Sequence, residues 1–262
     1  MSKLMSMEVF NAEIKDHNMA RFKNLLMWDE QKLNKFISSM AHCVQTTPKL
    51  LECTKESVLN SFIKCAELDL YPSSIWGEAF ILPYAKNKKL PSWAWDTTFE
   101  AQFQLWYQGI VTLLYRAWIQ FIESNIVYAA DHFELEQWAN PKLIHRPDPF
   151  KSQKDRWEAM GCYVVVTVNG HTAHKFMNKD DILRFKEFSQ SKGSEYSPWV
   201  PKNDPELWMW RKTVLKQFAK TLPKNRQLKA AIEYDNADGN IKLSKEEKEQ
   251  KVPDLTLLDK AK

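Results

Sequence analysis

The sequence contains little glycine, with only six residues in 262. Enzymes that hydrolyse nucleotides hold the phosphates in glycine-lined loops of the form G-x-x-x-x-G-K-[ST], and dinucleotide sites use G-x-G patterns. None of the six glycines fits either pattern. Without a recognisable backbone cradle for phosphates, an ATP-driven recombinase or helicase is disfavoured, and we expect no ATP cofactor.

Paired cysteines and long apolar runs are also absent. The four cysteines, Cys43, Cys53, Cys65 and Cys162, show no CxxC spacing, so we expect reduced thiols in a cytosolic compartment. No run of about 18 apolar residues occurs, and the first residues show no stretch typical of a signal peptide. We therefore expect a cytoplasmic protein without a membrane partner.

Hydrophobic periodicity predicts an α+β fold: N-terminal helices, a small mostly antiparallel sheet with packed helices, a basic C-terminal helix and a flexible tail. The expected helices cover residues 29–45, 55–68, 180–190 and 206–222, and the segment 101–118 begins as a strand and continues as a helix. The expected strands cover 77–84 and 125–138, and 162–177 forms a hairpin around Asn169-Gly170, a pair preferred in type I′ turns.

The last residues differ in composition from the rest of the chain. From Asn236 onward the sequence is highly charged and contains no aromatic residue. Such a segment cannot bury enough apolar surface to fold. We therefore expect one domain over residues 1–235 and a flexible charged tail over 236–262.

Positive charge is concentrated near the end of the expected domain. Eight Lys or Arg residues and two acids occur between Lys202 and Lys229, although the net charge of the whole chain is only +4. On the expected helix, Lys212, Lys216 and Lys220 recur every four residues and form one stripe, with Arg211 beside it. The stripe is either a solvated helix face or the binding surface for a polyanion.

Two observations favour the polyanion. A solvated helix usually interleaves acids with its lysines, and no acid occurs between Leu207 and Ala231. Three tryptophans, Trp199, Trp208 and Trp210, lie close by, and aromatic faces beside cations are how single-stranded nucleic acids are held. The interpretation of these tryptophans as core residues remains open.

Other chemistry has weaker support in the sequence. His171 and His174 form an HxxH pair, but residues three apart on a strand point to opposite faces, so we expect no metal site. Glu134 and Glu136 share one face of an expected strand and, with Asp131, could hold the metal of a nuclease. A metal-dependent nuclease is therefore retained as the alternative from the enzyme class.

Five segments in succession, between about residue 50 and residue 235, resemble motifs of the RecT-type phage recombinases, single-strand annealing proteins distantly related to phage lambda Red-beta. These segments are "AELDLYPSSIWGEAFILPYAK", "QFQLWYQGIVTLLYRAW", "FELEQWANPKLIHRPD", "GCYVVVTVNGHTAHKFMNKDDI" and "SPWVPKNDPELWMWRKTVLKQFAKTLP". Five such matches in order make the resemblance specific.

The resemblance implies a protein that is not an enzyme: it binds single-stranded DNA, assembles into rings or helical filaments, and anneals complementary strands without ATP in homologous recombination. It further implies a phage or prophage origin in a bacterial host, and a 5′–3′ exonuclease and a host single-strand binding protein as partners, with the tail as a docking segment. Mg²⁺ is expected only as a counterion of the single-stranded and annealed duplex DNA. A passive single-strand coating protein is a further alternative.

Site residues follow from the same resemblance. Arg211 and Lys212 fall on a Lys-Lys pair of the family, Lys216 on the first residue of an Arg-Arg pair, and Lys220 on a later lysine. The expected DNA contacts are Arg211, Lys212, Lys216, Lys220, Arg116, Lys179, Lys86, Lys202, Tyr107, Gln104 and Trp199.

The sequence departs from the family motifs at four places. Gln108 stands where a basic residue is usual, Trp106 and Asp69 stand where glycine is usual, and Gln217 replaces the second arginine of the Arg-Arg pair. The change at position 108 removes an expected phosphate contact, so the helix that begins near Glu206 is expected to supply more of the affinity.

Phosphate contacts make binding depend on salt. The logarithm of the binding constant for single strands should fall against the logarithm of salt concentration with a slope of about −0.7 per phosphate contacted. Changing Lys212 or Lys216 to Ala should weaken binding similarly for all sequences and make the slope shallower. An unchanged slope in a titration of each variant would show that these side chains do not contact phosphates.

Overall fold

The computed structural model describes residues 7–12, 14, 18–72, 75–89, 95–136, 141–222 and 226–238. The helices are α1 (Met7–Ala12), α2 (Met19–Leu25), α3 (Glu30–Thr46), the 3-10 helix η2 (Pro48–Glu52), α4 (Lys55–Glu67), α5 (Tyr107–Tyr115), α6 (Lys179–Lys186), α7 (Trp208–Ala219) and α8 (Arg226–Asp238). The strands are β1 (Ala79–Lys89), β2 (Trp95–Leu105), β3 (Phe121–Tyr128), β4 (His132–Glu136), β5 (Lys142–Arg146), β6 (Ala159–Val168) and β7 (His171–Asn178).

The expected α+β class is confirmed, but the strands do not form one sheet. Among the described residues they form a two-stranded sheet of β1 and β2, a three-stranded sheet in the order β3-β6-β7, and a two-stranded sheet of β4 and β5. Every pair within these sheets is antiparallel.

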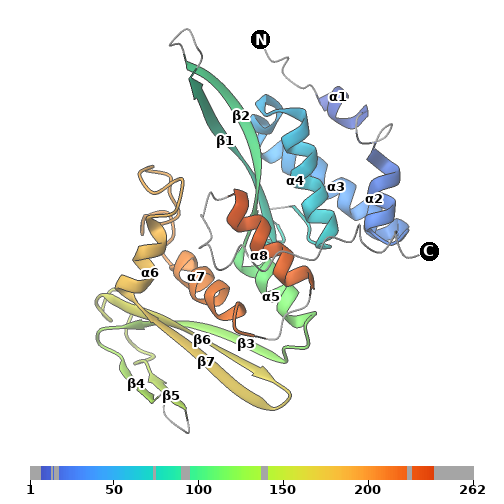
Figure 1. The fold of residues 1–262 in the computed structure, drawn as a ribbon. Coiled ribbons are helices and arrows are strands. Elements are labelled where there is room, and N and C mark those ends of the chain that lie inside the picture. The colour runs from blue at the N-terminus through green and yellow to red at the C-terminus, as the bar shows by residue number, and fades with distance from the viewer. Residues whose placement is uncertain are drawn as a thin grey trace, which may run out of the picture.

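The β1–β2 hairpin lies beside the N-terminal helices and extends away from the rest of the molecule (Figure 1). Alternation places Ile81 and Phe103 on the side that faces α4, where both are fully buried. The hydroxyl of Ser61 on α4 donates to the carbonyl of Ala101 at 3.1 Å. The opposite side of the hairpin, which carries Leu82 and Tyr84, is left to form the wall of a cleft.

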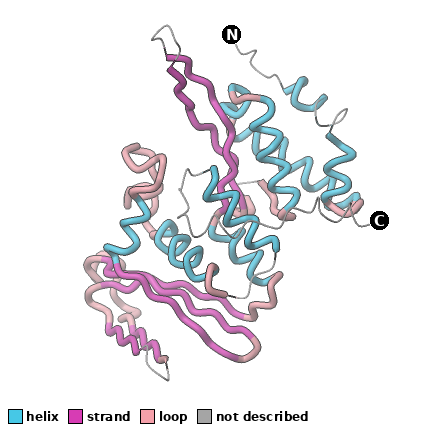
Figure 2. The backbone as a smooth tube through the Cα atoms, viewed as in Figure 1, coloured by secondary structure: helices cyan, strands magenta, loops and turns pink. Residues whose placement is uncertain are grey.

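Helices α6 and α7 cover one face of the three-stranded sheet, and the β4–β5 hairpin lies on the other side (Figures 1 and 2). Cys162, Val164 and Val166 of β6 are fully buried. The alternate residue Tyr163 points to the opposite face, where its ring stacks on Phe133 of β4 with centroids 6.0 Å apart. Both faces of β6 are therefore packed.

The segment 125–138 is not the single strand that its alternation predicts. It contains the end of β3 and all of β4, separated by a turn at residues 129–131. In this turn the amide of Tyr128 donates to the Asp131 carboxylate at 2.9 Å, and the amide of Asp131 donates to the carbonyl of Tyr128 at 3.0 Å. Alternation continues on both sides of the turn, so periodicity gave no sign of the reversal.

Local signals elsewhere were reliable. Asn169 and Gly170 connect β6 to β7 with φ of 50° and 77°, as a type I′ turn requires. Asn178 caps α6 by accepting a hydrogen bond from the amide of Asp181 at 2.8 Å.

Helix α8 continues to Asp238, past the expected domain end at 235. The expected flexible tail from residue 239 onward lies outside the described residues.

All four cysteines are free and buried, in agreement with the expectation of reduced thiols. Burial raises the pKa of the Cys162 thiol to about 12 and that of Cys43 to about 11, so these groups are poor nucleophiles. No helix in the described part of the chain is long and apolar enough to span a membrane.

Gly109 allows α5 to pack against the chain that precedes β1. A Cβ atom at this position would lie 2.2 Å from the carbonyl oxygen of Glu78 and 2.9 Å from Leu105 Cδ1. The backbone oxygen cannot move away freely, because it accepts a hydrogen bond from the amide of Trp106 at 3.0 Å. Close contact of backbone with backbone therefore requires glycine here.

Changing Gly109 to Ala should lower the free energy of unfolding by about 1–3 kcal/mol, because overpacking outweighs the gain in helix propensity. Urea denaturation followed by circular dichroism measures this. Gly193 has no atom within 4 Å of a Cβ built on it, so the matched change of Gly193 to Ala should stay within about 0.5 kcal/mol of wild type. Equal stability of the two variants would contradict the packing assignment.

Candidate nucleic-acid interface

A cleft of about 440 Å³ lies between the β1–β2 hairpin and α7. Its walls come from four separate parts of the sequence: the hairpin, the segment from the end of α6 to Trp199, α7, and the end of α8. Five of the eleven expected DNA contacts line it, namely Gln104, Trp199, Lys212, Lys216 and Lys220. The tertiary structure thus brings together residues that are up to 116 positions apart in the sequence.

Lys212 and Lys216 of α7 face this cleft together with Lys220, the residue directly after the helix, but the first two are not on a solvated stripe. Lys212 and Lys216 retain only 8% and 7% of their accessible surface. Both approach the carboxylate of Asp235 on α8: Lys216 Nζ donates to Oδ2, and Lys212 Nζ lies 3.7 Å from Oδ1. The amide of Leu105, at the end of β2, donates to Oδ1 at 2.9 Å.

The expectation of an unneutralised helix was therefore wrong in one respect. No acid follows the lysines within α7, yet Asp235 reaches them from the next helix in the chain. Sequence distance concealed this partner, because Asp235 lies 19 residues after Lys216 and on a different helix. Lys220 is partly exposed and lies further along the same side of α7.

One carboxylate cannot balance the ammonium groups around it. Asp235 faces the ammonium groups of both Lys212 and Lys216, so this cluster keeps one net positive charge. Burial lowers the pKa of Lys212, although Asp235 opposes this shift. Burial alone would raise the pKa of Asp235, but the charges of Lys212 and Lys216 hold it below 3.8. The cleft therefore has the electrostatics of an anion site.

Aromatic and amide groups complete the cleft walls. Lys212 lies over the ring of Trp106, with Nζ 5.3 Å from the centroid. The amide of Gln104 donates to the hydroxyl of Tyr84 at 2.6 Å. Trp199 is buried to 8% exposure, so its ring is part of the wall, and the core interpretation of this tryptophan is the one that fits.

Arg211 lies on the other side of α7 from the lysines. Its guanidinium donates to the carbonyl of Ser124 on β3 and lies over the ring of Trp208, 5.3 Å from the centroid. It lines a second cleft of about 530 Å³. The prediction that Arg211 stands beside the lysine stripe was wrong, because successive residues of a helix point about 100° apart.

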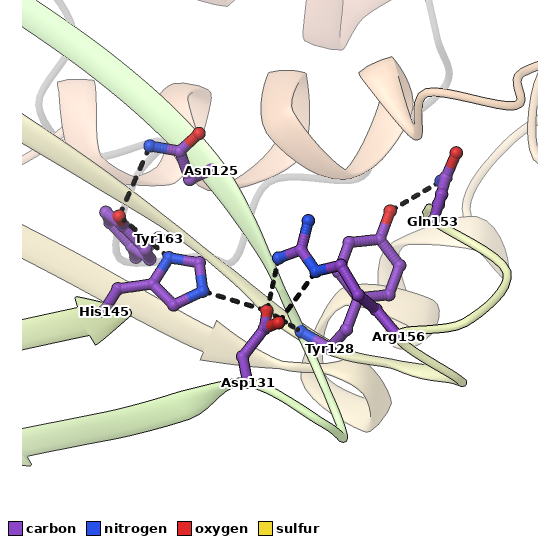
Figure 3. Close-up of polar contacts among 7 residues, drawn as sticks. All are labelled: Asn125, Tyr128, Asp131, His145, Gln153, Arg156 and Tyr163. Carbon is purple, nitrogen blue, oxygen red and sulfur yellow. Dashed lines mark hydrogen bonds and ion pairs between the residues drawn. The ribbon is translucent and has the colours of Figure 1, made fainter. Parts of the chain in front are cut away.

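Polar contacts around Asp131 form one side of this second cleft (Figure 3). Arg156 Nε donates to Asp131 Oδ1 at 2.7 Å, and His145 Nε2 lies 2.9 Å from Oδ2. His145 Nδ1 in turn lies 3.2 Å from the hydroxyl of Tyr163. Burial would raise the pKa of Asp131, but these contacts and the Tyr128 amide lower it to about 2.

The carboxylates proposed for a nuclease do not gather. The Asp131 side chain is 1% exposed and engaged with Arg156, whereas Glu134 and Glu136 are exposed on β4. Glu134 pairs with His132 at 2.9 Å. In the part of the chain that the structure describes, no group of three or more His, Cys, Asp or Glu residues could hold a metal ion.

Arg116 and Tyr107 have structural partners. The Arg116 guanidinium donates to the carbonyls of Leu68 at 2.9 Å and Asp69 at 2.8 Å, just after the end of α4. Asp69 has φ of 51°, which explains why glycine is usual at this position in the resembling motif. Tyr107 is buried, and its hydroxyl lies 2.9 Å from Ser124 Oγ.

The remaining expected cations lie outside the cleft. Lys86 pairs with Glu100 across the β1–β2 hairpin at 2.8 Å, and alternation places it on the same side of β1 as Tyr84. Lys179 pairs with Glu158 at the start of α6. Lys202 is exposed in the turns that precede α7.

Asp235, Phe188 and Tyr196 are among the cleft residues that sequence reasoning missed. Asp235 could not have been linked to α7 without knowing that α8 folds back against β2. Phe188 falls in the expected helix 180–190, and Tyr196 lies in the polar stretch 191–198, which suggested only a connecting segment. Exposed aromatic residues in such a polar segment were the available signal.

The charge cluster generates a stability prediction. Changing Asp235 to Asn should lower the free energy of unfolding at pH 7 by about 3–5 kcal/mol, because two buried ammonium groups lose their counterion. The pKa of Asp235 is lowered by folding, so its contribution is complete above about pH 4 and is lost as the pH falls through the lowered pKa. Urea denaturation at pH 7 and in acid should show the two proteins converging.

Exposed Glu233 on the same helix provides the matched control, since Glu233 to Gln should change stability by less than about 0.5 kcal/mol. The burial of Asp235 complicates the Lys216 to Ala test of DNA binding. That variant leaves the buried Asp235 carboxylate with only Lys212, whose Nζ lies 3.7 Å away. If the Asp235 to Asn variant is as stable as wild type at pH 7, the Asp235 carboxylate does not stabilise the fold and the prediction is wrong.

Comparison with known proteins agrees with the resemblance seen in the sequence. The model of the RecT family matches residues 34–254. Protein RecT of Escherichia coli (strain K12) is 26% identical over 198 residues, which cover 74% of this chain and 68% of that protein. The matched span includes every residue of the two clefts. The chain therefore belongs to the RecT family, a family of recombination-related single-strand annealing proteins.

Proposed function

We propose that the chain binds single-stranded DNA through its sugar–phosphate backbone in the cleft between the β1–β2 hairpin and α7, and that it pairs complementary strands without ATP. The observation that carries the proposal is the convergence of Lys212, Lys216 and Lys220 with Gln104 from the hairpin on one cleft, where the Asp235 carboxylate faces two of these lysines. Family membership supports the annealing activity.

The charge balance of the cleft suggests how a strand is held. Lys216 forms an ion pair with Asp235. Lys212 lies farther from that carboxylate, and burial disfavours its charged form and so lowers its pKa. A phosphate entering the cleft supplies a second negative charge close to both ammonium groups. Because the lysines are already desolvated, each charge–charge contact there is stronger than on an open surface.

Sequence specificity in this proposal comes from the second strand. The cationic groups address phosphates and carry no information on base identity. Watson–Crick pairing with an incoming strand then selects the complement. Bond chemistry is not required, and the proposal assigns no catalytic residue and no cofactor, with Mg²⁺ as a DNA counterion only.

We further propose, from family membership alone, that several copies assemble into a ring or helical filament along one strand, so that a long stretch is presented for pairing. A 5′–3′ exonuclease that produces single strands and a host single-strand binding protein are the partners that such an activity needs.

Lys220 offers the sharpest test, because it lines the cleft and is less buried than Lys212 and Lys216. Changing Lys220 to Gln should weaken binding to a fluorescent oligonucleotide at low salt and reduce the magnitude of the salt slope by about 0.7. The matched control is Lys229 to Gln, which removes the same charge from an exposed position on α8 outside the cleft.

Three results of the accompanying strand-pairing assay separate the alternatives. Faster pairing of complementary oligonucleotides at unchanged length supports annealing. Slower pairing despite tight binding points to a coating protein, and shortened strands in Mg²⁺ or Mn²⁺ point to a nuclease. Identical salt slopes for Lys220 to Gln and Lys229 to Gln would contradict the placement of DNA in this cleft.

A further inference from the structure

Two exposed aromatic side chains stand at the cleft. Phe188 is 58% exposed and Tyr196 is 89% exposed, and both line the cleft that holds the α7 lysines. Among the large apolar side chains that are exposed in the described ranges, these two are the members that belong to this cleft. Their position at a cationic cleft makes them candidates for contact with a ligand that carries both negative charge and flat apolar faces.

The other aromatic residues of the cleft are already engaged. Trp106 packs edge-on against Phe80, with centroids 5.5 Å apart, and carries Lys212 on its face. Trp199 is buried, and the hydroxyl of Tyr84 accepts a hydrogen bond from Gln104. The rings of Phe188 and Tyr196 make no ring–ring or cation–ring contact within the described part of the chain.

The backbone that carries these two rings is fixed. The amide of Phe188 donates to the carbonyl of Phe185 at 3.2 Å, at the end of α6. Near Tyr196, the side-chain amide of Asn203 donates to the carbonyls of Glu195 at 2.6 Å and Ser197 at 3.0 Å. Anchored backbone with free rings is an arrangement suited to stacking, because little ordering is left to occur when a flat ligand arrives.

We propose that Phe188 and Tyr196 stack on nucleobases of the strand whose phosphates face the α7 lysines. This inference rests on the proposed function and extends it, since it adds base contacts to a site otherwise described by its charges. Stacking uses the faces of the bases and tolerates every sequence. The hydrogen-bonding edges stay free for a complementary strand, which is the condition that annealing imposes.

An abasic strand separates stacking from charge, because it keeps the phosphates and lacks the bases. The affinities of the full chain for a thymidine oligonucleotide and for an abasic deoxyribose-phosphate strand of equal length are compared by fluorescence anisotropy at one salt concentration. Changing both residues to Leu (Phe188→Leu, Tyr196→Leu) should weaken thymidine binding at least about fivefold and leave abasic binding unchanged.

Two control variants make the comparison specific. Exchanging the two aromatic types (Phe188→Tyr, Tyr196→Phe) should retain the wild-type preference for thymidine over the abasic strand. Phe150→Leu, at a side chain that is 96% exposed and outside the cleft, should leave both affinities unchanged. Circular dichroism of each variant verifies that the fold is kept.

Suppose that the wild-type chain binds DNA and that the Leu variant has the same ratio of thymidine to abasic affinity as wild type. This result overturns the stacking role and leaves the proposed function standing. Parallel loss of both affinities also overturns it, because the residues would then act on the fold or on phosphates. Failure of the wild-type chain to bind either strand overturns the proposed function itself, and the stacking role with it.

Discussion

The contact of Asp235 with Lys212 and Lys216 is the interaction on which the candidate interface depends. It joins α7 to α8, and through the amide of Leu105 it joins both helices to the end of β2. A buried ion pair adds little net stability compared with apolar packing, but loss of one partner is costly. The cluster therefore fixes the position of the lysines more than it strengthens the fold, and that position is what creates a positively charged cleft.

The same cluster explains why the lysines serve structure and electrostatics together. Two ammonium groups face one carboxylate, so the protein itself leaves part of their charge unbalanced. A fully neutralised cluster would have no net charge with which to attract an anion. On a fully exposed stripe, water and salt would screen the attraction between the lysines and an anion. The arrangement lies between these limits, with the cations partly desolvated and still accessible from the cleft.

Asp69 and Gly109 show how backbone geometry restricts the residue at two positions. Asp69 takes a left-handed conformation at a position where glycine is usual, and its carboxylate accepts a hydrogen bond from Lys32 at 2.9 Å and lies 3.6 Å from Arg116. The guanidinium of Arg116, the residue that follows α5, therefore holds the end of α4 and contributes to the fold. Gly109 is retained because the Glu78 carbonyl occupies the space that a Cβ would need.

Most local elements, the α+β class, the family and the basic helix could be predicted from the residues alone, because periodicity, turn residues and motifs act between residues that are close along the chain. It could not determine the division into three sheets, the reversal at Asp131, or the partner of Lys212 and Lys216, since each depends on contacts between distant segments. Whether a cation faces water, a carboxylate or a cleft is decided by which segments fold back beside it. Only the tertiary structure therefore placed Arg211 apart from the lysines and brought Phe188 and Tyr196 to the same cleft.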